Sequence, residues 1–390
     1  MTSPPIVVAG AGIGGLAAAL RLARAGASVR LLERAGAIEE VGAGLQIAPN
    51  AGRVLQELGL GPALDAAALE PEAIVIHRAR DGALLARLPL GGAFERWGAP
   101  FRVFHRADLQ QLLLEAARRV GTIDIRTHAR VGDFEEADGA VHIRVHGENG
   151  PEDIEAAGLV GADGVRSSVR ASLVRAAKDA PVFSGQTAWR ALVPADSAPA
   201  RLRGREAHLW LGPGAHVVHY PLRDASLISA VVIVESAIFH PASSLTGPAL
   251  ARETGFSRWS DDLLGLLEAA PQWRRWPLYA RPALPRWSHG AVTLLGDAAH
   301  PMLPFLAQGA AQAIEDAEAL GRAFAPGVAP AVAFAAYERA RVERATKVQR
   351  ASRRQGVYFH LSGPAAAARD LAISLLGGRG MLERNAWLYR

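Results

Sequence analysis

The segment Gly10-Ala11-Gly12-Ile13-Gly14-Gly15 contains the spacing G-x-G-x-x-G, whose chemistry would be the binding of a phosphate. Glycine permits a tight turn and lets the backbone approach a pyrophosphate, which then lies at the amino-terminal end of a helix. The motif follows an apolar run at residues 6–9 and precedes an alanine- and leucine-rich segment that reaches about residue 24. This order of strand, turn and helix predicts a dinucleotide-binding site rather than a tight turn without a ligand.

An acidic residue completes the first motif. Residues 28–32 form a second apolar run, and Glu33 ends it eighteen positions after Gly15. A carboxylate at this point of a strand–helix–strand unit can bind the ribose hydroxyls of a dinucleotide. The motif alone does not separate NAD from FAD.

Two later segments bear on that choice. Gly161-Ala162-Asp163-Gly164 and Gly296-Asp297 each follow a short apolar strand. A carboxylate at a strand end can accept hydrogen bonds from ribityl hydroxyls, as we expect of Asp297. Taken singly, each segment is also typical of an Asp-Gly turn or of an aspartate that caps a helix. Three such glycine and acid positions in one chain favour FAD.

Two histidines are candidates for a base, because histidine exchanges protons near neutral pH. They lie in the run Gly214-Ala215-His216-Val217-Val218-His219-Tyr220-Pro221, which reads as a strand. The alternation of a strand puts His216 and Tyr220 on one face and His219 on the other. At this point either histidine, or a purely structural pair, remains open.

The remaining pattern predicts the elements that must position these groups. Helices are expected at residues 49–58, 108–119, 310–324 and 331–355 and after residue 364, with a helical piece at 263–270. Alternating polarity between residues 123 and 159, with a turn at Asp138-Gly139, predicts an antiparallel meander. Strands are expected at residues 101–104, 187–193, 208–210, 217–222, 227–234 and 292–295. A parallel βαβ unit and a mostly antiparallel sheet therefore occur in one α/β chain.

Composition excludes several classes of protein. The 390 residues include no cysteine, so disulfides and thiolate chemistry are ruled out. The net charge of +5 comes from scattered arginines, with lysine only at Lys178 and Lys347. No basic tail or aromatic-rich basic patch points to nucleic acid, and no apolar stretch is long enough to cross a bilayer. We expect a cytoplasmic protein that binds neither nucleic acid nor membrane, and no metal, since the histidines lack ligand spacing.

On the three glycine and acid motifs, in this order, the sequence resembles the single-component FAD-dependent aromatic hydroxylases. The segment Leu303-Pro304-Phe305-Leu306-Ala307-Gln308-Gly309-Ala310-Ala311, followed by Ile314-Glu315-Asp316-Ala317, is similar to the salicylate, 3-hydroxybenzoate and 6-hydroxynicotinate branch. The resemblance implies a Rossmann-like, para-hydroxybenzoate-hydroxylase-like FAD domain with a mostly antiparallel substrate domain and C-terminal helices. We expect the FAD domain at residues 1–75, 100–180 and 280–355, the substrate domain at 76–99 and 181–279, and a C-terminal helical segment at 356–390.

The resemblance also implies residue roles. Glu33 and Arg34 hold the adenosine ribose, Val131 contacts the adenine, and Asp163 serves both FAD and the nicotinamide partner. Asp297 binds the ribityl chain, and Arg106 reaches that chain or the pyrophosphate. The other residues expected at the cofactor are Gly10, Gly12, Ile13, Gly14 and Gly15 at the pyrophosphate, Gln46, and Gly309 and Ala310 at the flavin pyrimidine edge. His216, Tyr220 and Pro301 are expected at the reaction, with Pro301 beside the isoalloxazine.

The resemblance implies hydroxylation of an electron-rich aromatic acid with NADH or NADPH and dioxygen, through a flavin C4a-hydroperoxide. A base that withdraws the phenolic proton makes the ring more nucleophilic. Gln46 stands where the hydroxynicotinate enzymes have a histidine base, which argues against hydroxynicotinate as the substrate. Pro304 stands where one hydroxybenzoate branch has glutamine, which argues against the substrate of that one branch. Trp189 and Arg190 are either acid contacts or structural residues. Epoxidase, halogenase or reductase chemistry, a flavin-free dehydrogenase and a non-catalytic FAD protein are the alternatives, and a monomer or homodimer is expected.

Overall fold

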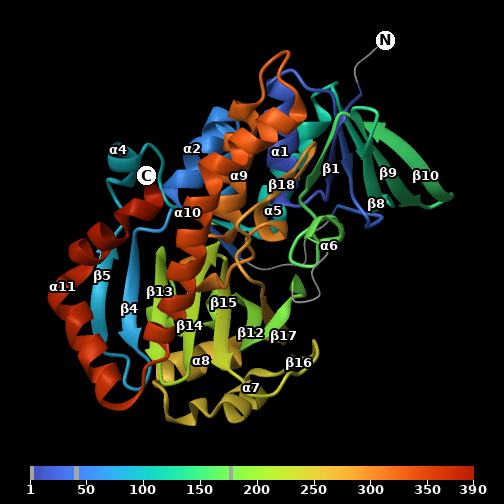
Figure 1. Cartoon of the computed structure of the whole chain (residues 1–390). Coiled ribbons are helices and arrows are strands. Elements are labelled where there is room, and N and C mark those ends of the chain that lie inside the picture. The colour runs from blue at the N-terminus through green and yellow to red at the C-terminus, as the bar shows by residue number, and fades with distance from the viewer. Residues whose placement is uncertain (1–3, 39–43, 175–178) are drawn as a thin grey trace.

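The computed structural model describes residues 4–38, 44–174 and 179–390 (Figure 1). Gly42 and Ala43, which precede Gln46 by a few residues, lie outside these ranges, as does Lys178. The predicted fold class is confirmed, because a parallel α/β half stands beside a large, mostly antiparallel sheet and is followed by C-terminal helices. Among the described residues, no helix combines the length and apolarity needed to cross a membrane.

A six-stranded sheet carries the first motifs, in the order β18-β19-β11-β1-β2-β7. Its strands are β1 (Ile6–Ala9), β2 (Val29–Leu32), β7 (Ile123–Arg126), β11 (Gly158–Gly161), β18 (Ser288–His289) and β19 (Val292–Leu294). All pairs are parallel except β18 with β19. The strands β1, β11 and β19 are buried throughout, as expected where helices cover a parallel sheet. The carboxyl ends of these three strands place the GxGxxG, DG and GD motifs side by side.

Helices cover this sheet and extend its core. They are α1 (Ile13–Arg24), α2 (Pro49–Glu57), α3 (Gly61–Ala67), α5 (Arg106–Arg118), α6 (Ser168–Val174) and α9 (Gly309–Ala323). Helix α1 packs along α9 and α5. Because α1 is rich in alanine and glycine, its axis approaches these neighbours closely, and its leucines fill the core.

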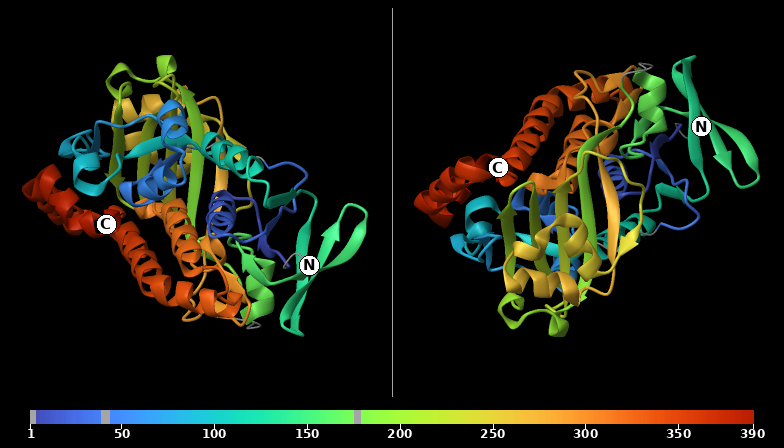
Figure 2. Two further views of the ribbon diagram at one scale, coloured as in Figure 1. Left: turned by 90° about the horizontal axis from the view of Figure 1, so that it is seen from above. Right: turned by 90° about the horizontal axis from the view of Figure 1, so that it is seen from below.

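The residues between 123 and 159 correct one prediction. Only β8 (Arg130–Ala137), β9 (Ala140–Gly147) and β10 (Gly150–Ala156) form the antiparallel meander. The flanking strands β7 and β11 belong instead to the parallel sheet, since their apolar residues are needed in its core. The meander projects from the side of the molecule (Figure 2).

An eight-stranded sheet forms the second half, in the order β16-β17-β12-β15-β14-β13-β4-β5. Its strands are β4 (Ala73–Arg78), β5 (Leu84–Pro89), β12 (Val182–Pro194), β13 (Glu206–Gly212), β14 (Ala215–Leu222), β15 (Leu227–Glu235), β16 (Ser244–Leu245) and β17 (Trp273–Ala280). One pair, β4 with β13, is parallel. Helices α7 (Gly247–Thr254) and α8 (Asp261–Ala269) cover one face, where Trp189, Val217 and Val232 pack against leucines. The opposite face is free to line a site.

A short two-stranded sheet connects the halves, from β3 (Gly44–Ile47) and β6 (Arg102–His105), and the short helix α4 (Ala93–Trp97) precedes β6. Two long helices then end the chain, α10 (Pro330–Phe359) and α11 (Gly363–Tyr389). Helix α10 runs from the parallel half toward the large sheet, and α11 packs along β5 (Figures 1 and 2). The expected boundary at residue 356 falls inside α10, because this helix continues to Phe359. The division into domains stays a prediction.

Candidate active site

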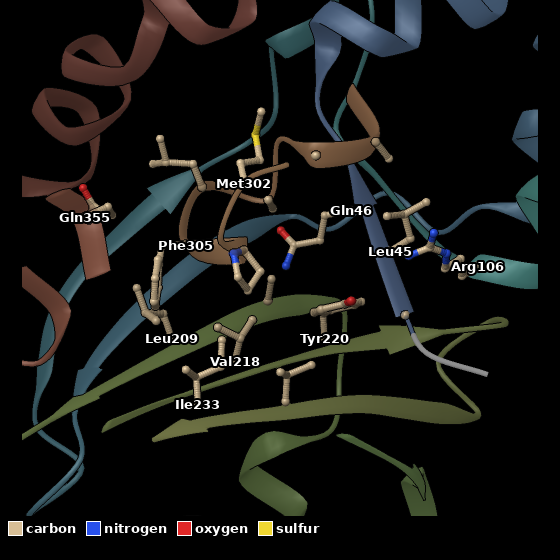
Figure 3. Close-up of a pocket in the computed structure, with 18 of the residues that line it drawn as sticks. Leu45, Gln46, Arg106, Leu209, Val218, Tyr220, Ile233, Met302, Phe305 and Gln355 are labelled. Carbon is tan, nitrogen blue, oxygen red and sulfur yellow. The ribbon is translucent and has the colours of Figure 1, made fainter. Parts of the chain in front are cut away.

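A cavity of about 490 Å³ lies between the carboxyl ends of the parallel strands and the free face of the large sheet. This volume is typical of small-molecule sites. One wall comes from the glycine loop, the GD loop and the start of α9, and the floor comes from β13, β14 and β15. Strand β3 and the segment around Phe305 close the cavity from other sides (Figure 3).

The glycine loop has the shape that its motif predicts. Gly10 has φ +102°, a conformation that side-chain-bearing residues rarely adopt, and a Cβ there would lie 2.6 Å from the Ala162 carbonyl oxygen. A Cβ on Gly15 would lie 1.9 Å from the Gly10 oxygen. Gly12 differs, because apart from its neighbours in the chain no atom of the described residues lies within 4 Å of its Cβ position, and it lines the cavity. Gly10 and Gly15 therefore close the turn, whereas Gly12 leaves space for a ligand.

The three acidic positions have different surroundings. The Glu33 carboxylate accepts hydrogen bonds from the backbone N–H groups of Ala11 and Ala35, both at 2.9 Å. One oxygen of Asp163 accepts the N–H and hydroxyl of Ser168 and so caps α6, while its other oxygen, Oδ1, is buried without a partner among the described residues. Asp297 lines the cavity directly. The capping role of Asp163 and an orphaned acceptor thus occur in the same side chain.

Buried charges hold the GD loop in place behind the cavity. Asp316, fully buried on α9, accepts hydrogen bonds from His300 Nε2 at 2.5 Å, the Gly296 N–H at 3.0 Å and Arg341 Nε at 2.7 Å. Burial alone would raise the pKa of Asp316, but His300 and Arg341 outweigh it and lower this pKa to about 2. Glu315 in turn binds Arg341 and Arg344. The loop and the start of α9 are therefore fixed to α10.

A second buried arginine joins the DG and GD segments. Arg170 donates to the carbonyl oxygens of Ala298 at 3.1 Å and Ala299 at 2.9 Å, and it also binds Asp179. Burial would raise the pKa of Asp179, but the hydrogen bond and charge of Arg170, with Arg281, leave it below its usual value. Two motifs far apart in the sequence are thus held in one arrangement.

The floor of the cavity follows from strand register. His216 pairs with Ile233 on β15, Val218 with Val231 and Tyr220 with Ser229. Paired residues share a face, so the floor has an apolar middle and one polar residue toward each end. Figure 3 shows Gln46 reaching over Val218 and Tyr220. The predicted alternation is confirmed, because His219 lies on the other face, stacked on His208 with ring centroids 4.5 Å apart.

The two polar floor residues differ in their proton chemistry. His216 is buried, and its pKa lies well below the ordinary value, mainly because of this burial and also because of the neighbouring His360. The imidazole is therefore neutral at pH 7. Burial raises the pKa of Tyr220 to about 12, although its hydrogen bond with Ser229 opposes the shift. Tyr220 is therefore a hydrogen-bond donor rather than a base near neutral pH.

The structure gathers most of the predicted site residues but not all. Those that line the cavity are Gly12, Ile13, Gly14, Gln46, Arg106, His216, Tyr220, Asp297, Gly309 and Ala310. Gly10 and Gly15 shape the loop from behind, and Asp163 and Glu33 lie next to it. Pro301 is buried outside the lining, and its carbonyl accepts a hydrogen bond from Gln349. Arg34 is exposed and Val131 is buried in the core, both away from the cavity. The roles of all these residues stay predictions.

Several residues at the site had no role in the sequence analysis. Asp316 was named only as part of a motif, and Arg170, Arg341, Ser229 and His360 were given no role. No spacing signal would have found them, because their partners lie far away in the chain. A buried charge is recognisable only after the packing that buries it is known.

The residues fit FAD. The first turn of α1 begins at Ile13 and that of α9 at Gly309, and both line the cavity with N–H groups that lack intrahelical acceptors. Helix starts of this kind favour negative charge, as in a pyrophosphate or a reduced flavin. The open side of Gly12 and the orphaned Asp163 oxygen leave room and acceptors for a dinucleotide. In the described ranges, no group of three or more histidine and acidic side chains is gathered that could hold a metal.

Comparison with known proteins defines the class. The model of the FAD-binding domain family matches residues 4–352. The chain belongs to this family, and it is an FAD-dependent aromatic monooxygenase. FAD is therefore its cofactor, and the family uses NADH or NADPH, as predicted.

Two relatives and one solved structure illustrate this similarity. The 3-hydroxybenzoate 6-hydroxylase 1 of Aquipseudomonas alcaligenes is 38% identical over 387 residues, which cover 98% of this chain and 96% of that protein. The 3-amino-4-hydroxybenzoate 2-monooxygenase PtnB3 of Streptomyces platensis is 40% identical over 391 residues, covering 99% and 96%. A solved salicylate hydroxylase substrate complex has a TM-score of 0.83 at 25% identity and covers 100% of this chain and 95% of that chain.

Proposed function

We propose that this protein hydroxylates a small aromatic acid that carries a phenolic hydroxyl, a hydroxybenzoate- or salicylate-like compound. The observation that carries the proposal is the pair His216 and Tyr220. They lie on one face of β14 in a cavity whose opposite wall is formed by the cofactor motifs. The relatives act, by their names, on hydroxybenzoates and an aminohydroxybenzoate, which supports this substrate class.

The separation of the two residues suits one aromatic ring. Four residues of a strand span about 13 Å, which leaves room between His216 and Tyr220 for one substituted ring and a hydrogen bond at each end. Val218 and Val231 lie between them and provide apolar contact for the ring. A hydroxybenzoate would then place its hydroxyl at His216 and its carboxylate toward Tyr220.

At the hydroxyl end, His216 accepts the phenolic proton. The imidazole is neutral. The ring centroids of Phe305 and Phe359 lie 5.5 Å and 5.1 Å from that of His216, so these apolar rings keep water away from it. Withdrawal of the proton makes the substrate ring more nucleophilic. When bound, FAD takes electrons from NADH or NADPH and delivers one oxygen atom of dioxygen to the ring. The protein holds the ring in place and controls this one proton.

At the carboxylate end, donors and positive charge converge. The Tyr220 hydroxyl donates a hydrogen bond to the substrate carboxylate, and Gln46 reaches over Tyr220 from β3 (Figure 3). In the part of the chain that the structure describes, the charged residues that line the cavity are Arg106, Arg190 and Asp297. The lining thus carries two positive charges and one negative charge, and this excess of positive charge favours an anionic ligand. We assign Arg190 to the substrate acid and keep Arg106 and Asp297 for FAD.

The remaining roles at the cofactor are part of the same proposal. Glu33 binds the adenosine ribose, since each carboxylate oxygen keeps a second acceptor site. The start of α9 stabilises the reduced flavin. Gln46 takes no proton, which argues against a hydroxynicotinate substrate that needs a base at that point.

The test is dioxygen-dependent NADH and NADPH oxidation by the FAD-loaded protein against a panel of hydroxylated benzoates and pyridine acids, with product masses recorded. We expect one or more hydroxybenzoates to stimulate oxidation and to gain one oxygen atom. Loss of the carboxylate would place the reaction with the salicylate type. Stimulation only by neutral aromatics would contradict the proposed acid-binding end.

A further inference from the structure

His216 is the first member of a hydrogen-bonded chain that leads away from the cavity. Its Nδ1 lies 2.8 Å from Nε2 of His360, and Nδ1 of His360 lies 3.1 Å from Oε1 of Glu235. The side chain of His360 is 2% exposed, whereas that of Glu235 is 57% exposed. Three side chains from β14, the end of α10 and the end of β15 thus connect a buried imidazole to solvent.

Backbone hydrogen bonds also hold His216, His360 and Glu235 in place. The carbonyl oxygen of His360 accepts a hydrogen bond from the Gly214 N–H at 3.0 Å, and the Glu235 N–H donates to the Gly214 oxygen at 2.9 Å. All three positions therefore meet at one turn between β13 and β14. Figure 1 shows α10 ending at this side of the large sheet.

The acceptor at the outer end determines where the protons lie. An ionised Glu235 only accepts, so His360 Nδ1 carries the proton of that bond. A neutral His360 then has an unprotonated Nε2, which must receive its bond from the Nδ1–H of His216. The Nε2 of His216 is left without a proton, and this is the state that a base needs.

We propose that His360 and Glu235 are positioning residues that set the tautomer of His216 and carry the substrate proton from it to solvent. This inference rests on the proposed role of His216 as the base. It adds a route, built from residues outside the cavity lining, by which the proton leaves a water-poor site.

The proton step balances along the chain. The substrate O–H bond breaks and a new N–H forms at His216 Nε2, while the Nδ1 proton of His216 moves to His360 Nε2. The Nδ1 proton of His360 moves to Glu235 and from there to water. The product phenolate takes a proton back by the reverse sequence, which restores the starting tautomers.

The surroundings explain why a relay is needed. The groups that face His360 are His216 on β14, Glu235 on β15 and Arg369 on α11. Burial holds the pKa of His360 below its ordinary value; Glu235 opposes this shift and Arg369 adds to it. His216 is also a weak base because of its burial. Neither imidazole holds a second proton at pH 7, so a proton taken from the substrate passes on.

The test uses the FAD-loaded protein without NADH and a nitro-substituted hydroxybenzoate as probe, because its ionised form absorbs visible light. Stopped-flow absorbance gives the rate of ionisation on binding, and a titration gives the affinity. The variants are H216Q, H360Q and E235Q. Glutamine at position 360 still accepts the hydrogen bond of His216 but transfers no proton. E206Q, at a partly exposed glutamate on β13 that pairs with Arg87, is the matched control.

We expect H360Q to bind the probe with nearly unchanged affinity but to ionise it about 10-fold or more slowly, with a larger solvent deuterium effect. E235Q should slow the step less, and E206Q should leave it unchanged. If H216Q abolishes ionisation while H360Q ionises at the original rate, the relay is wrong and the base stands. If H216Q ionises the probe normally, the base itself is wrong, and the relay falls with it.

Discussion

The cofactor wall and the substrate floor of the cavity are built from different parts of the chain. The wall is mostly backbone, presented by Gly12 and by the starts of α1 and α9. The floor is made of side chains from β13, β14 and β15, and β14 contributes both His216 and Tyr220. A change in the wall should therefore act through shape, whereas a change in the floor should act through chemistry. The predictions below test this difference.

The largest effect is expected in the wall. Gly12→Val should leave a folded protein that lacks FAD, because its side chain would occupy the open space beside the loop. Gly15→Val should instead impair folding, since the same atoms would collide with the Gly10 carbonyl. Flavin absorbance per protein and circular dichroism separate the two outcomes. A Gly12→Val protein that retains FAD would show that the wall does not contact the pyrophosphate.

The next effect is expected in the floor. His216→Ala should keep FAD but reduce coupled hydroxylation by about 10²- to 10⁴-fold, the usual contribution of a general base. His219→Ala is the matched control on the opposite face and should lower stability more than coupling. Product formed per NADH measures the difference. Equal coupling in both variants would move the base away from the floor.

A third prediction concerns the support behind the wall. Asp316→Ala should cost about 3–5 kcal/mol of unfolding free energy, because it leaves Arg341 buried without its partner. Asp81→Ala, which breaks an exposed pair with Arg78, should cost at most about 1 kcal/mol. Denaturant unfolding of both FAD-free variants provides the measurement. Similar costs would mean that the buried network does not hold the GD loop.

The smallest effect is expected from acid. Burial, followed by the charge of His77, lowers the pKa of His208 from 6.5 to about 4. The unfolded chain then binds a proton more readily than the folded one, so stability is complete above pH 6.5 and falls as the pH decreases toward 4. His208→Gln should flatten this part of the curve. If the free energy of unfolding of the variant fell equally steeply between pH 6.5 and 4, His208 would be excluded as a cause of this loss of stability.

The sequence predicted local features of both the wall and the floor better than the long-range contacts behind them, for a physical reason. Gly10, Gly12 and Gly15 lie together in the chain, and their spacing is set by one turn, so the turn is readable in advance. The alternation of β14 correctly separated His216 from His219. Pro301, which was expected beside the flavin, does not line the cavity, and its role stays a prediction. The contacts of Asp316, Arg170 and His360 depend on segments that only the folded structure brings together.

The most direct test of the central claim is turnover of the FAD-loaded protein with isotopically labelled dioxygen and a hydroxybenzoate, in wild type and Tyr220→Phe. The account predicts one labelled oxygen atom in the product, with a weaker affinity of the variant for the acid but not for the corresponding phenol without a carboxylate. Release of all labelled oxygen as peroxide or water, with no label in any aromatic product, would contradict it.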